Sequence, residues 1–571
     1  MQASETQLFK LLEGTKQFVI PLFQRTYSWD KEDWRILWED IIETYEMPGE
    51  GRHFLGSIVC KSLKATPEGV SPFVVIDGQQ RLTTLTLLLA ALRDVVRESD
   101  TQQANKIHDR YLTNDYVSDN DVYKVLPTQA DRTEYFAVID GKPVINVSSS
   151  VRQAYEYFCG RCRHKPTADE EAAIDLKKMA VVVATGLELV SITLDEPDNE
   201  YRIFESLNAK GAELTQADLL RNYFFMNIPP ANSKQDRVYD DVWLPMQRAL
   251  GPSLEDFFRY TYMSGGAFFD QSDAYKDWKG GTFVRQGDVY QEWKRRLDKL
   301  ALKDYTDQLA TFAHASRYYN QLIDPKAEPN AAISEGLTRL NRWGSQTVYP
   351  FLLYAYAQYD VGAVDATGVV EILRMIESFL VRRLFAGVPT NGLNRIFLRL
   401  SQQVPTTGNV VEGTRAALSE PGRRWPRDDD FRRSILSYPL YLDSRPDQRK
   451  LILERLEASF GHKEALSNFD TLSIEHIMPQ TLTDEWRSAL GTNADDVHRR
   501  YIHVLGNLTL TGYNPDLSNK PFSHKKVLLA DSNIAMNKAI AKESEWTAEK
   551  IEERGRLLAD RAVDIWPGPQ Q

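Results

Sequence analysis

Two short stretches near the C-terminus decide the fold there: Ser473–Pro479 (SIEHIMP) and His503–Asn514 (HVLGNLTLTGYN). The first alternates apolar and polar residues, as in a short strand, and ends at a proline, which cannot donate to a strand ladder. The second resumes the alternation after a Gly-Asn turn, so the two strands can pair. Pro521 and the apolar residues after it indicate a helix that begins near the proline. The predicted unit is β-β-α.

Four polar residues of this unit suit phosphodiester hydrolysis. Such a reaction needs a base for water and a hard cation for the charge that develops on the phosphate. His476 is the candidate base, because the unperturbed pKa of imidazole lies near neutrality. Glu475 and Asn514 are candidate ligands of Mg²⁺ or a similar divalent ion. Asn507, on the second strand, is a candidate for orienting the His476 ring.

These residues resemble the HNH branch of the His-Me finger nucleases, in which an acidic residue precedes the catalytic histidine and an asparagine opens the helix. The resemblance implies a ββα-metal nuclease domain over residues 469–571, with Mg²⁺ or Mn²⁺ as its cofactor. Glu475 stands where aspartate is commoner in that family. The alternative interpretation is that His476 packs at a strand end and the asparagines make turns.

Composition limits the class of protein. A chain of 571 residues is too long for one core and predicts two to four domains. The net charge of −11 argues against non-specific coating of nucleic acid, without excluding a local basic groove. The first residues lack the features of a signal peptide, and the longest apolar run, Leu85–Leu92, is too short for a bilayer, so we expect a cytoplasmic protein with no membrane partner. Cys159 and Cys162, near His164, lack the second pair that a zinc site would need.

A second group of polar residues lies near the N-terminus. The apolar run Phe73–Ile76 leads into the sequence DGQQR, after which leucines and valines recur at helical spacing. This pattern predicts a strand-to-helix junction, which aims free backbone N–H groups at an anion that the glycine allows to approach closely. No Walker loop is present. The candidate nucleotide-binding residues at this junction are Asp77, Gly78, Gln79, Gln80 and Arg81.

Upstream of the junction, Val19–Trp29 (VIPLFQRTYSW) combines a strand-like beginning with Gln24 and Arg25. This polar and aromatic group can equally line a ligand pocket or cap a surface. Trp34 and Trp38 follow at helical spacing and are predicted to pack.

Together with Phe204–Gly211 (FESLNAKG), these elements resemble the ParB-like N-terminal domain of GmrSD-type modification-dependent restriction endonucleases, a family that includes SspE- and BrxU-like proteins. The resemblance implies a sensor domain over residues 1–231 that binds a nucleoside triphosphate, with GTP, ATP and CTP all left open. Gln24 and Arg25 would belong to its pocket. The remaining residues that the resemblance assigns to this pocket are Asn208 and Lys210.

Behind that stretch, Thr215 is predicted to cap a helix with Asp218 as its partner three residues later. Asp218 and Arg221 either support the nucleotide pocket or are ordinary charges of that helix.

Residues 232–468 carry long helical patterns and few strand signals, which predict a helical middle domain. The predicted fold class is therefore α+β and multidomain: a ParB-like α/β domain, a helical middle and a ββα nuclease domain. Phe257, Phe258, Tyr260 and Tyr262 are predicted to form a buried helix face. Candidates for phosphate contact are Arg423, Arg424, Arg427, Arg432 and Arg433, although Asp428–Asp430 lie between them.

These features predict a DNA endonuclease of the modification-dependent restriction type, active in anti-phage defence and regulated by a nucleotide. Expected partners are DNA, in particular modified phage DNA, and a nucleotide; the resemblance is compatible with a homodimer. The candidate DNA contacts are Tyr27, Lys520, Lys525 and Lys526. Two alternatives stay open. One is a nucleotide-binding switch whose nuclease-like end is a non-hydrolytic binding module, and the other is a nucleotide hydrolase that acts on small molecules through Asp77 and Arg81.

Overall fold

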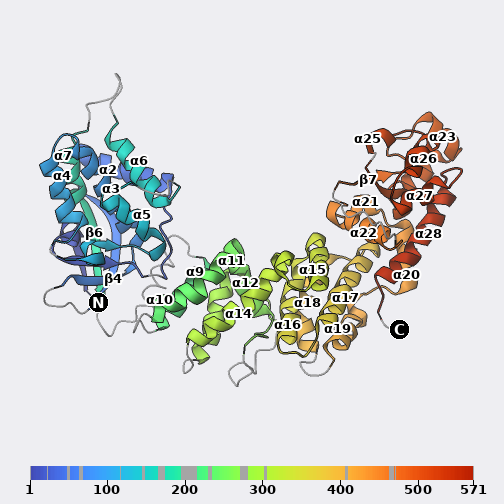
Figure 1. Cartoon of the computed structure of the whole chain (residues 1–571), viewed down its shortest axis with the longest axis horizontal. Coiled ribbons are helices and arrows are strands. Elements are labelled where there is room, and N and C mark those ends of the chain that lie inside the picture. Colours follow the sequence, from blue (N-terminus) through green and yellow to red (C-terminus); the bar gives the residue numbers. More distant parts are fainter. Residues whose placement is uncertain are drawn as a thin grey trace. The chain divides into compact units, whose positions relative to one another are not determined.

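The computed structural model forms two compact units, Met1–Asp241 and Val242–Gln571 (Figure 1). It describes residues 2–569 apart from 22, 48–51, 64–68, 116, 144–147, 165–173, 195–214, 229–233, 270–280, 301–304, 405–408, 462–468, 470 and 513, and describes Leu300 and Asn514 without their side chains. Among these described residues, no helix is both long and apolar enough to cross a membrane.

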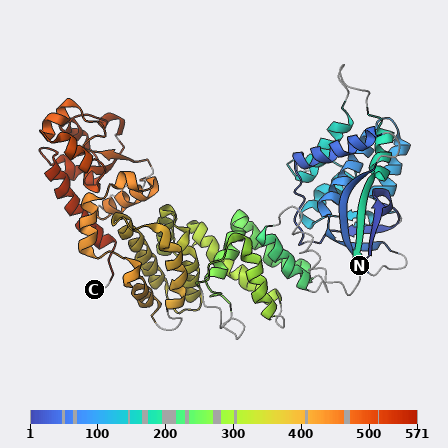
Figure 2. The same ribbon diagram turned by 180° about the vertical axis from the view of Figure 1, so that it is seen from behind.

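The first unit is built on a six-stranded mixed sheet with the strand order β1-β6-β3-β4-β2-β5. Figure 2 shows curved strands of this unit, in blue and green, beside its helices. β3 runs parallel to β6 and antiparallel to β4, and β2 runs parallel to β4 and β5. β1 closes one edge by antiparallel pairing with β6. The strands are β1 (Gln2–Gln7), β2 (Lys16–Val19), β3 (His53–Ser62), β4 (Ser71–Asp77), β5 (Val125–Leu126) and β6 (Leu187–Leu194).

Helix α3 is the central helix of this unit and is buried along nearly its whole length, because leucine, alanine and threonine occupy all of its faces. Trp34 and Trp38 of α2 are buried, which confirms that they pack. Thr215 caps α9 and Asp218 completes the predicted capping box. The helices are α1 (Leu8–Leu12), α2 (Lys31–Glu46), α3 (Gln79–Arg97), α4 (Thr101–Ile107), α5 (Gln129–Ile139), α6 (Ser150–Cys162), α7 (Leu176–Val181), α9 (Gln216–Asn227) and α10 (Lys234–Val238).

The junction between β4 and α3 confirms the predicted strand-to-helix turn. β4 ends at Asp77, and α3 begins after Gly78, whose φ of +89° lies in the left-handed region. A Cβ atom on Gly78 would lie 2.8 Å from the carbonyl oxygen of Ser57 on β3. Glycine, which has no Cβ atom, tolerates both this backbone conformation and this close approach.

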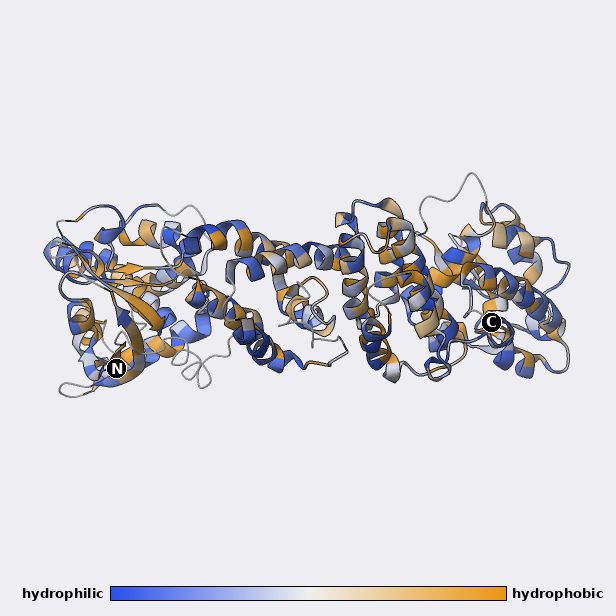
Figure 3. Cartoon of the chain, turned by 90° about the horizontal axis from the view of Figure 1, so that it is seen from below, coloured by the Kyte–Doolittle hydropathy of each residue, from blue (hydrophilic) through white to orange (hydrophobic). Residues whose placement is uncertain are grey.

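The second unit begins with a long helical segment, as predicted. Its described residues up to Gly461 form helices and no strands, and Phe257, Phe258, Tyr260 and Tyr262 of α12 are buried. Figure 3 shows hydrophilic and hydrophobic residues alternating along these helices. The helices are α11 (Leu244–Leu250), α12 (Leu254–Met263), α13 (Val289–Leu297), α14 (Tyr305–Ile323), α15 (Ala331–Trp343), α16 (Tyr349–Asp360), α17 (Ala366–Phe385), α18 (Leu393–Gln403), α19 (Val410–Leu418), α20 (Asp428–Ser437), α21 (Leu440–Asp443) and α22 (Pro446–Ala458).

The C-terminal part of this unit contains the predicted β-β-α arrangement. β7 and β8 pair antiparallel, with Glu475 opposite Thr509 and His476 opposite Leu508. Pro521 is the N-cap of α26, close to where a helix start was predicted. The elements are β7 (Ser473–His476), α23 (Asp484–Leu490), α24 (Ala494–Tyr501), β8 (Leu508–Thr511), α25 (Asn514–Leu517), α26 (Phe522–Ala530), α27 (Ala535–Ala541) and α28 (Ala548–Ile565).

Helices of the predicted middle domain pack against the C-terminal elements. The carboxylate of Glu457 on α22 accepts hydrogen bonds from the backbone N–H groups of Ala535 (2.6 Å) and Met536 (3.0 Å), at the start of α27. Arg561 of α28 donates to the carbonyl oxygen of Ser459, just after α22. The two segments therefore share one unit, and the division into three domains at residues 231 and 468 stays a prediction.

We expect Gly78→Ala to lower the free energy of unfolding by about 2–3 kcal/mol, because alanine strains the left-handed backbone and meets Ser57. Gly160→Ala is the matched control, since Gly160 lies in helix α6 with no atom within 4 Å of an added Cβ. Urea denaturation of both variants and of the natural chain measures the free energy of unfolding. Equal stability of the two variants would contradict this account.

Candidate active site

His476 is the last residue of β7, and its side chain is buried between neighbours from two other segments. Its Nε2 atom lies 3.3 Å from Nδ1 of His503, and its Nδ1 atom lies 3.3 Å from Nε2 of Gln480. The strand therefore fixes the backbone of His476, and a second imidazole and an amide face its two ring nitrogens.

Tyr441 of α21 completes this group. The centroid of its ring lies 4.4 Å from that of His476, edge to face, and 5.7 Å from that of His503, nearly parallel. The Tyr441 N–H donates to the carbonyl oxygen of His503 at 3.1 Å, and the Arg449 guanidinium lies 4.2 Å from the centre of the Tyr441 ring. No role was predicted for Tyr441, which lies in the segment assigned to the middle domain. His503 was part of the second stretch, but no chemistry was assigned to it.

Both histidines are neutral at physiological pH. Burial, followed by the charges of His503, Lys525 and Arg449, lowers the pKa of His476 to about 3. Burial also lowers the pKa of His503. The unperturbed pKa of imidazole, for which His476 was chosen as the candidate base, does not apply at this buried position, because burial desolvates the imidazolium. The neutral form can accept a proton, but a pKa of about 3 makes this imidazole a weak base while Gln480 and His503 face its two ring nitrogens.

Glu475 leaves β7 on the face opposite to His476 and meets Lys525 of α26. Nζ of Lys525 donates to Glu475 Oε1 at 2.6 Å and to the carbonyl oxygen of His476 at 2.9 Å. Burial raises the pKa of Glu475 and lowers that of Lys525, while each partner opposes the shift of the other. Lys525 is fully buried, so its predicted contact with DNA is wrong.

The predicted metal site is only partly supported by these donors. Glu475 offers a buried carboxylate, which suits a hard cation, but the ammonium of Lys525 already balances its charge. The side chain of Asn514, the second predicted ligand, lies outside the described residues, although its backbone opens α25. Among the described residues, no group of three or more His, Cys, Asp or Glu side chains could hold a metal ion. A divalent ion at Glu475 would therefore compete with Lys525.

Asn507 does not orient the His476 ring as predicted. It ends a short 3₁₀ turn before β8, and its Oδ1 accepts from Met478 N (2.8 Å) and Trp546 Nε1 (3.0 Å). Its Nδ2 donates to the carbonyl oxygens of Met478 (2.9 Å) and Ile502 (3.0 Å). These four bonds use the full capacity of the amide, so none is left for an imidazole. Asn507 acts on His476 through the backbone that follows β7.

The other two lysines predicted to contact DNA differ in exposure. Lys526 is half-buried, and its ammonium donates to the carbonyl oxygen of Glu543 at 2.6 Å. Lys520 is exposed in the turn between α25 and α26. The contact between Lys520 and DNA stays a prediction.

At the N-terminal site, several motif residues hold the loop before α2. Gln80 accepts from Ser28 N at 2.8 Å and donates to the carbonyl oxygen of Thr26 at 3.1 Å. Gln24 is buried and donates to the carbonyl oxygen of Ile76 at 3.0 Å. The Tyr27 hydroxyl is buried against Thr84, 2.7 Å away, so its predicted contact with DNA is wrong.

Arg81 turns back to β3. Its Nη1 donates to the carbonyl oxygen of Ser57 at 2.7 Å, and its guanidinium lies over Gly56, where an added Cβ would come within 2.9 Å of Nη2. Burial lowers the pKa of Arg81, and the charge of Asp77 partly offsets this. Arg81 and Asp77 thus lie close enough to interact, at the N-terminal end of α3.

Arg25 and Gln79 are among the described motif residues that keep free hydrogen-bonding groups. Nε of Arg25 is buried without a partner, and the Gln79 amide makes no hydrogen bond to the described residues. Arg221 is buried rather than a surface charge; it pairs with Asp218 at 2.7 Å and donates to the carbonyl oxygen of Phe23, supporting the loop that carries Arg25. Asn208 and Lys210 lie outside the described residues.

Within the described part of the chain, the cysteine pair belongs to no group of side chains that could hold a metal ion. Cys159 and Cys162 are buried in α6, and burial raises the pKa of both thiols, to about 12 for Cys162.

Two family models match the chain. Residues 8–225 match the N-terminal domain of GmrSD restriction endonucleases, and residues 425–561 match the C-terminal domain of the same family. The second match begins before α20, so it includes Tyr441 and Arg449 together with β7 and β8. No curated protein matches the chain.

We expect Asn507→Asp to lower the free energy of unfolding by about 2–4 kcal/mol, because a carboxylate cannot donate to the carbonyl oxygens of Met478 and Ile502. Thermal unfolding measures this loss. Asn493→Asp is the matched control, since Asn493 is exposed and caps α24 without a side-chain hydrogen bond. A loss of stability in the control as large as in Asn507→Asp would refute the assigned role.

Proposed function

Because the chain belongs to the GmrSD-type restriction endonucleases, we propose that it cuts or nicks DNA at the group formed by His476, His503 and Tyr441. The observation that carries this proposal is the neutral imidazole of His476 at the end of β7, facing a second neutral imidazole. Both lie in the segment matched by the C-terminal domain of the family.

His476 would act as the general base. Attack of a water oxygen on a DNA phosphorus forms one P–O bond and breaks the P–O bond to the leaving sugar oxygen. The water proton passes to a ring nitrogen of His476, and the leaving oxygen takes a proton from solvent to become a hydroxyl. His503 is less buried than His476 and would accept or relay that proton towards solvent. Gln480 would fix the other ring nitrogen of His476.

A divalent ion, Mg²⁺ or Mn²⁺, would be held by Glu475 and Asn514 and would supply charge stabilisation to the phosphate. The pairing of Glu475 with Lys525 implies that such an ion binds only when the ammonium moves from the carboxylate. An HNH-type, metal-dependent mechanism is thus part of the proposal.

The N-terminal domain would bind a nucleoside triphosphate. Binding or hydrolysis of that nucleotide would regulate the cutting of modified phage DNA. Three features support an anion there: the open N-terminus of α3, the unpartnered Nε of Arg25 and the free amide of Gln79. Gly78 is the N-cap residue of α3 and has no side chain that could block this end of the helix.

The rival function is a non-hydrolytic DNA- or protein-binding module at the C-terminal end. One observation favours it: the predicted metal ligand Glu475 and the predicted orienting residue Asn507 are both engaged in structural bonds. Loss of cutting in a folded His476 variant separates the two functions.

We expect the purified chain with Mg²⁺ or Mn²⁺ to cut supercoiled plasmid or modified phage DNA, and His476→Ala to slow this by about 10²–10⁴-fold, the usual contribution of a general base. Initial rates from gel assays, with and without nucleotide, measure it. Chelation of the metal by EDTA should abolish cutting.

His524→Ala is the matched control, because His524 is an exposed imidazole next to Lys525 on α26 and should leave the rate unchanged. Circular dichroism establishes that both variants are folded. Equal cutting by His476→Ala and the natural chain would exclude the proposed base, and no cutting of any DNA would favour the binding module.

We expect Arg25→Ala to weaken binding of GTP, ATP or CTP by about 10–100-fold, the range for losing a charge-assisted contact, without changing thermal stability. Titration with fluorescent GTP, ATP and CTP shows which nucleotide binds and measures the change in its affinity. Arg35→Ala is the control, since Arg35 is paired with Glu32 and Glu39 on the surface of α2. Unchanged nucleotide affinity in Arg25→Ala would remove Arg25 from the pocket.

A further inference from the structure

Two adjoining cavities lie in the helical part of the second unit, outside the His476 group. The larger has a volume of about 1510 Å³ and lies between α15, α17, α18 and the segment that carries α21. The smaller, of about 470 Å³, lies between α18 and the turn before α20. Arg383, Val388 and Pro389 line both, so the two cavities meet at one place.

Arg383 is a buried cation at this junction. Its Nη2 donates to the carbonyl oxygen of Pro389 at 2.9 Å, and its Nη1 donates to that of Arg423. The structure pairs it with no carboxylate within the described residues, and its exposed fraction is 6 %. Burial, and then the charge of Arg424, lowers the pKa of Arg383. The guanidinium also lies 5.2 Å from the centre of the Phe379 ring. A buried charge held by carbonyl dipoles and a ring face, without a counter-ion, leaves a positive field that an anion would offset.

The smaller cavity concentrates this field. Its lining contains five arginines and one carboxylate, Glu420, which is already bonded to Gln403 and Arg423. Arg395 and Arg399 are exposed, four residues apart on α18, and neither has a hydrogen bond or ion pair within the described residues. Like charges at this spacing destabilise a helix. The five arginines are Arg383, Arg395, Arg399, Arg423 and Arg424.

Several other arginines at the surface of this unit pair with carboxylates. Arg433 pairs with Asp430 and Arg295 pairs with Glu292, each within one helix. Arg432 pairs with Asp560 at 2.8 Å. Arg248, Arg285, Arg317 and Arg427 of this unit are also exposed without an ion pair to the described residues. What distinguishes Arg395 and Arg399 is their position one turn apart in the lining of a cavity that contains three further arginines, in a chain whose net charge is −11.

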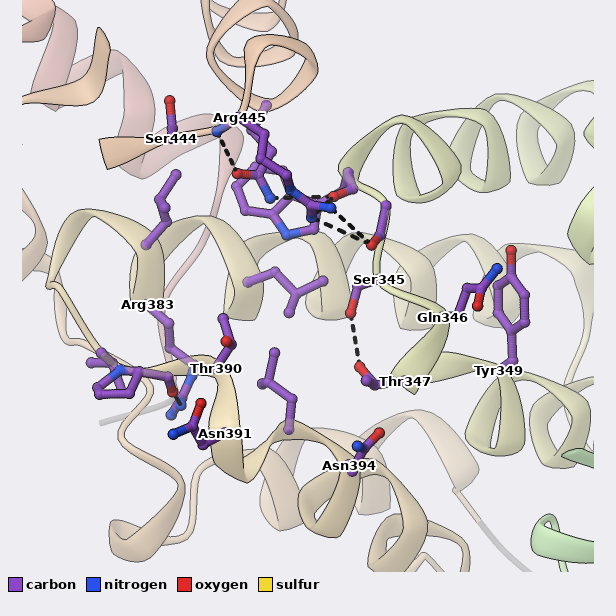
Figure 4. A pocket seen from close by; sticks show the side chains of 18 of the residues that line it. Ser345, Gln346, Thr347, Tyr349, Arg383, Thr390, Asn391, Asn394, Ser444 and Arg445 are labelled. Atoms are coloured by element: carbon purple, nitrogen blue, oxygen red, sulfur yellow. Dashed lines mark hydrogen bonds between the residues drawn. The ribbon is translucent and has the colours of Figure 1, made fainter. Parts of the chain in front are cut away.

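The larger cavity adds side chains that suit bases or sugars. Gln346, Asn391 and Asn394 surround it, and their amides make no hydrogen bond to the described residues (Figure 4). Ser345 and Thr347, by contrast, bond to each other at 2.8 Å. Free amides donate and accept at once, which is the chemistry that recognises base edges and sugar hydroxyls.

The far wall of this cavity is the helix that carries Tyr441. Leu442, Asp443 and Ser444 line the cavity, while the Tyr441 ring contacts His476 and His503. A single helix of four residues, α21, therefore separates the cavity from the imidazole pair.

We propose that the two cavities form one groove that binds a DNA strand, with its phosphates on Arg383, Arg395 and Arg399 and its bases or sugars against Gln346, Asn391 and Asn394. This inference rests on the proposed DNA cleavage, because it names where the substrate lies beside α21. A free nucleotide would use the same phosphate chemistry. The larger cavity alone exceeds the range of about 300–1,000 Å³ that is usual for small-molecule sites, which favours a polymer.

The test measures binding of a short fluorescent DNA, single-stranded and duplex, to the full chain in EDTA so that no cutting occurs. We expect Arg395→Ala/Arg399→Ala to weaken binding by about tenfold or more at moderate salt. It should also reduce the slope of log affinity against log salt by about 2, one unit for each lost phosphate contact. Its melting temperature should be unchanged or raised, because repulsion between the two arginines is removed.

Arg295→Ala/Arg433→Ala is the matched control, since it removes the same charge from arginines that carboxylates already neutralise. It should keep the affinity and the salt slope of the natural chain. Tripolyphosphate and ATP are added as competitors; competition at concentrations comparable to DNA phosphate, with full displacement, would assign the site to a free polyphosphate and overturn the proposal.

An affinity and salt slope equal to those of the natural chain in Arg395→Ala/Arg399→Ala, or no DNA binding by the natural chain, would also overturn it. The same proteins are assayed for cutting with Mg²⁺. Weaker DNA binding by Arg395→Ala/Arg399→Ala, together with no cutting by the natural chain, would support the groove and reject the nuclease. Cutting by the natural chain, together with unchanged DNA binding by Arg395→Ala/Arg399→Ala, would support the nuclease and reject the groove.

Discussion

The side-chain amide of Asn507 is the interaction on which the C-terminal site depends. Its four hydrogen bonds join the backbone after β7, the end of α24 and the indole of Trp546 before α28. A buried amide that is fully bonded is stable only in one arrangement of its partners, because every displacement leaves a donor or acceptor unsatisfied. The position of His476 at the end of β7 follows from that arrangement, since Met478 is held two residues later.

In the N-terminal motif, too, side-chain amides hold the backbone in place. The side-chain amides of Gln24 and Gln80 form hydrogen bonds with the backbone of Ile76, Thr26 and Ser28. These bonds hold the loop against the start of α3. Arg25 lies within that loop and keeps a buried Nε without a partner. Polar motif residues thus serve two purposes: some build the frame, and others are left for a ligand. Sequence pattern alone cannot separate them, because glutamine, arginine and asparagine suit either purpose.

Short-range patterns predicted the fold well, and long-range contacts decided what they missed. The turn at Gly78 and the cap at Thr215 each depend on residues within a few positions of one another, and β7 and β8 were each predicted from the local alternation of apolar and polar residues. Tyr441 reaches His476 only through tertiary packing, and nothing in its local sequence indicates this. Lys525 and Lys526 are neighbours, yet only the first points inward to Glu475, because helix periodicity places adjacent residues on different faces.

The charge distribution resolves an apparent conflict between an acidic chain and a nucleic-acid substrate. A net charge of −11 disfavours contact with DNA over the general surface, and some exposed arginines, such as Arg295 and Arg433, pair with carboxylates one turn away on the same helix. Arg383 escapes this cancellation because its partners are carbonyl oxygens, and Arg395 and Arg399 escape it because α18 offers them no acid. A local field of this kind concentrates attraction for phosphate at one groove. An acidic surface elsewhere then increases selectivity, since a strand that misses the groove is repelled.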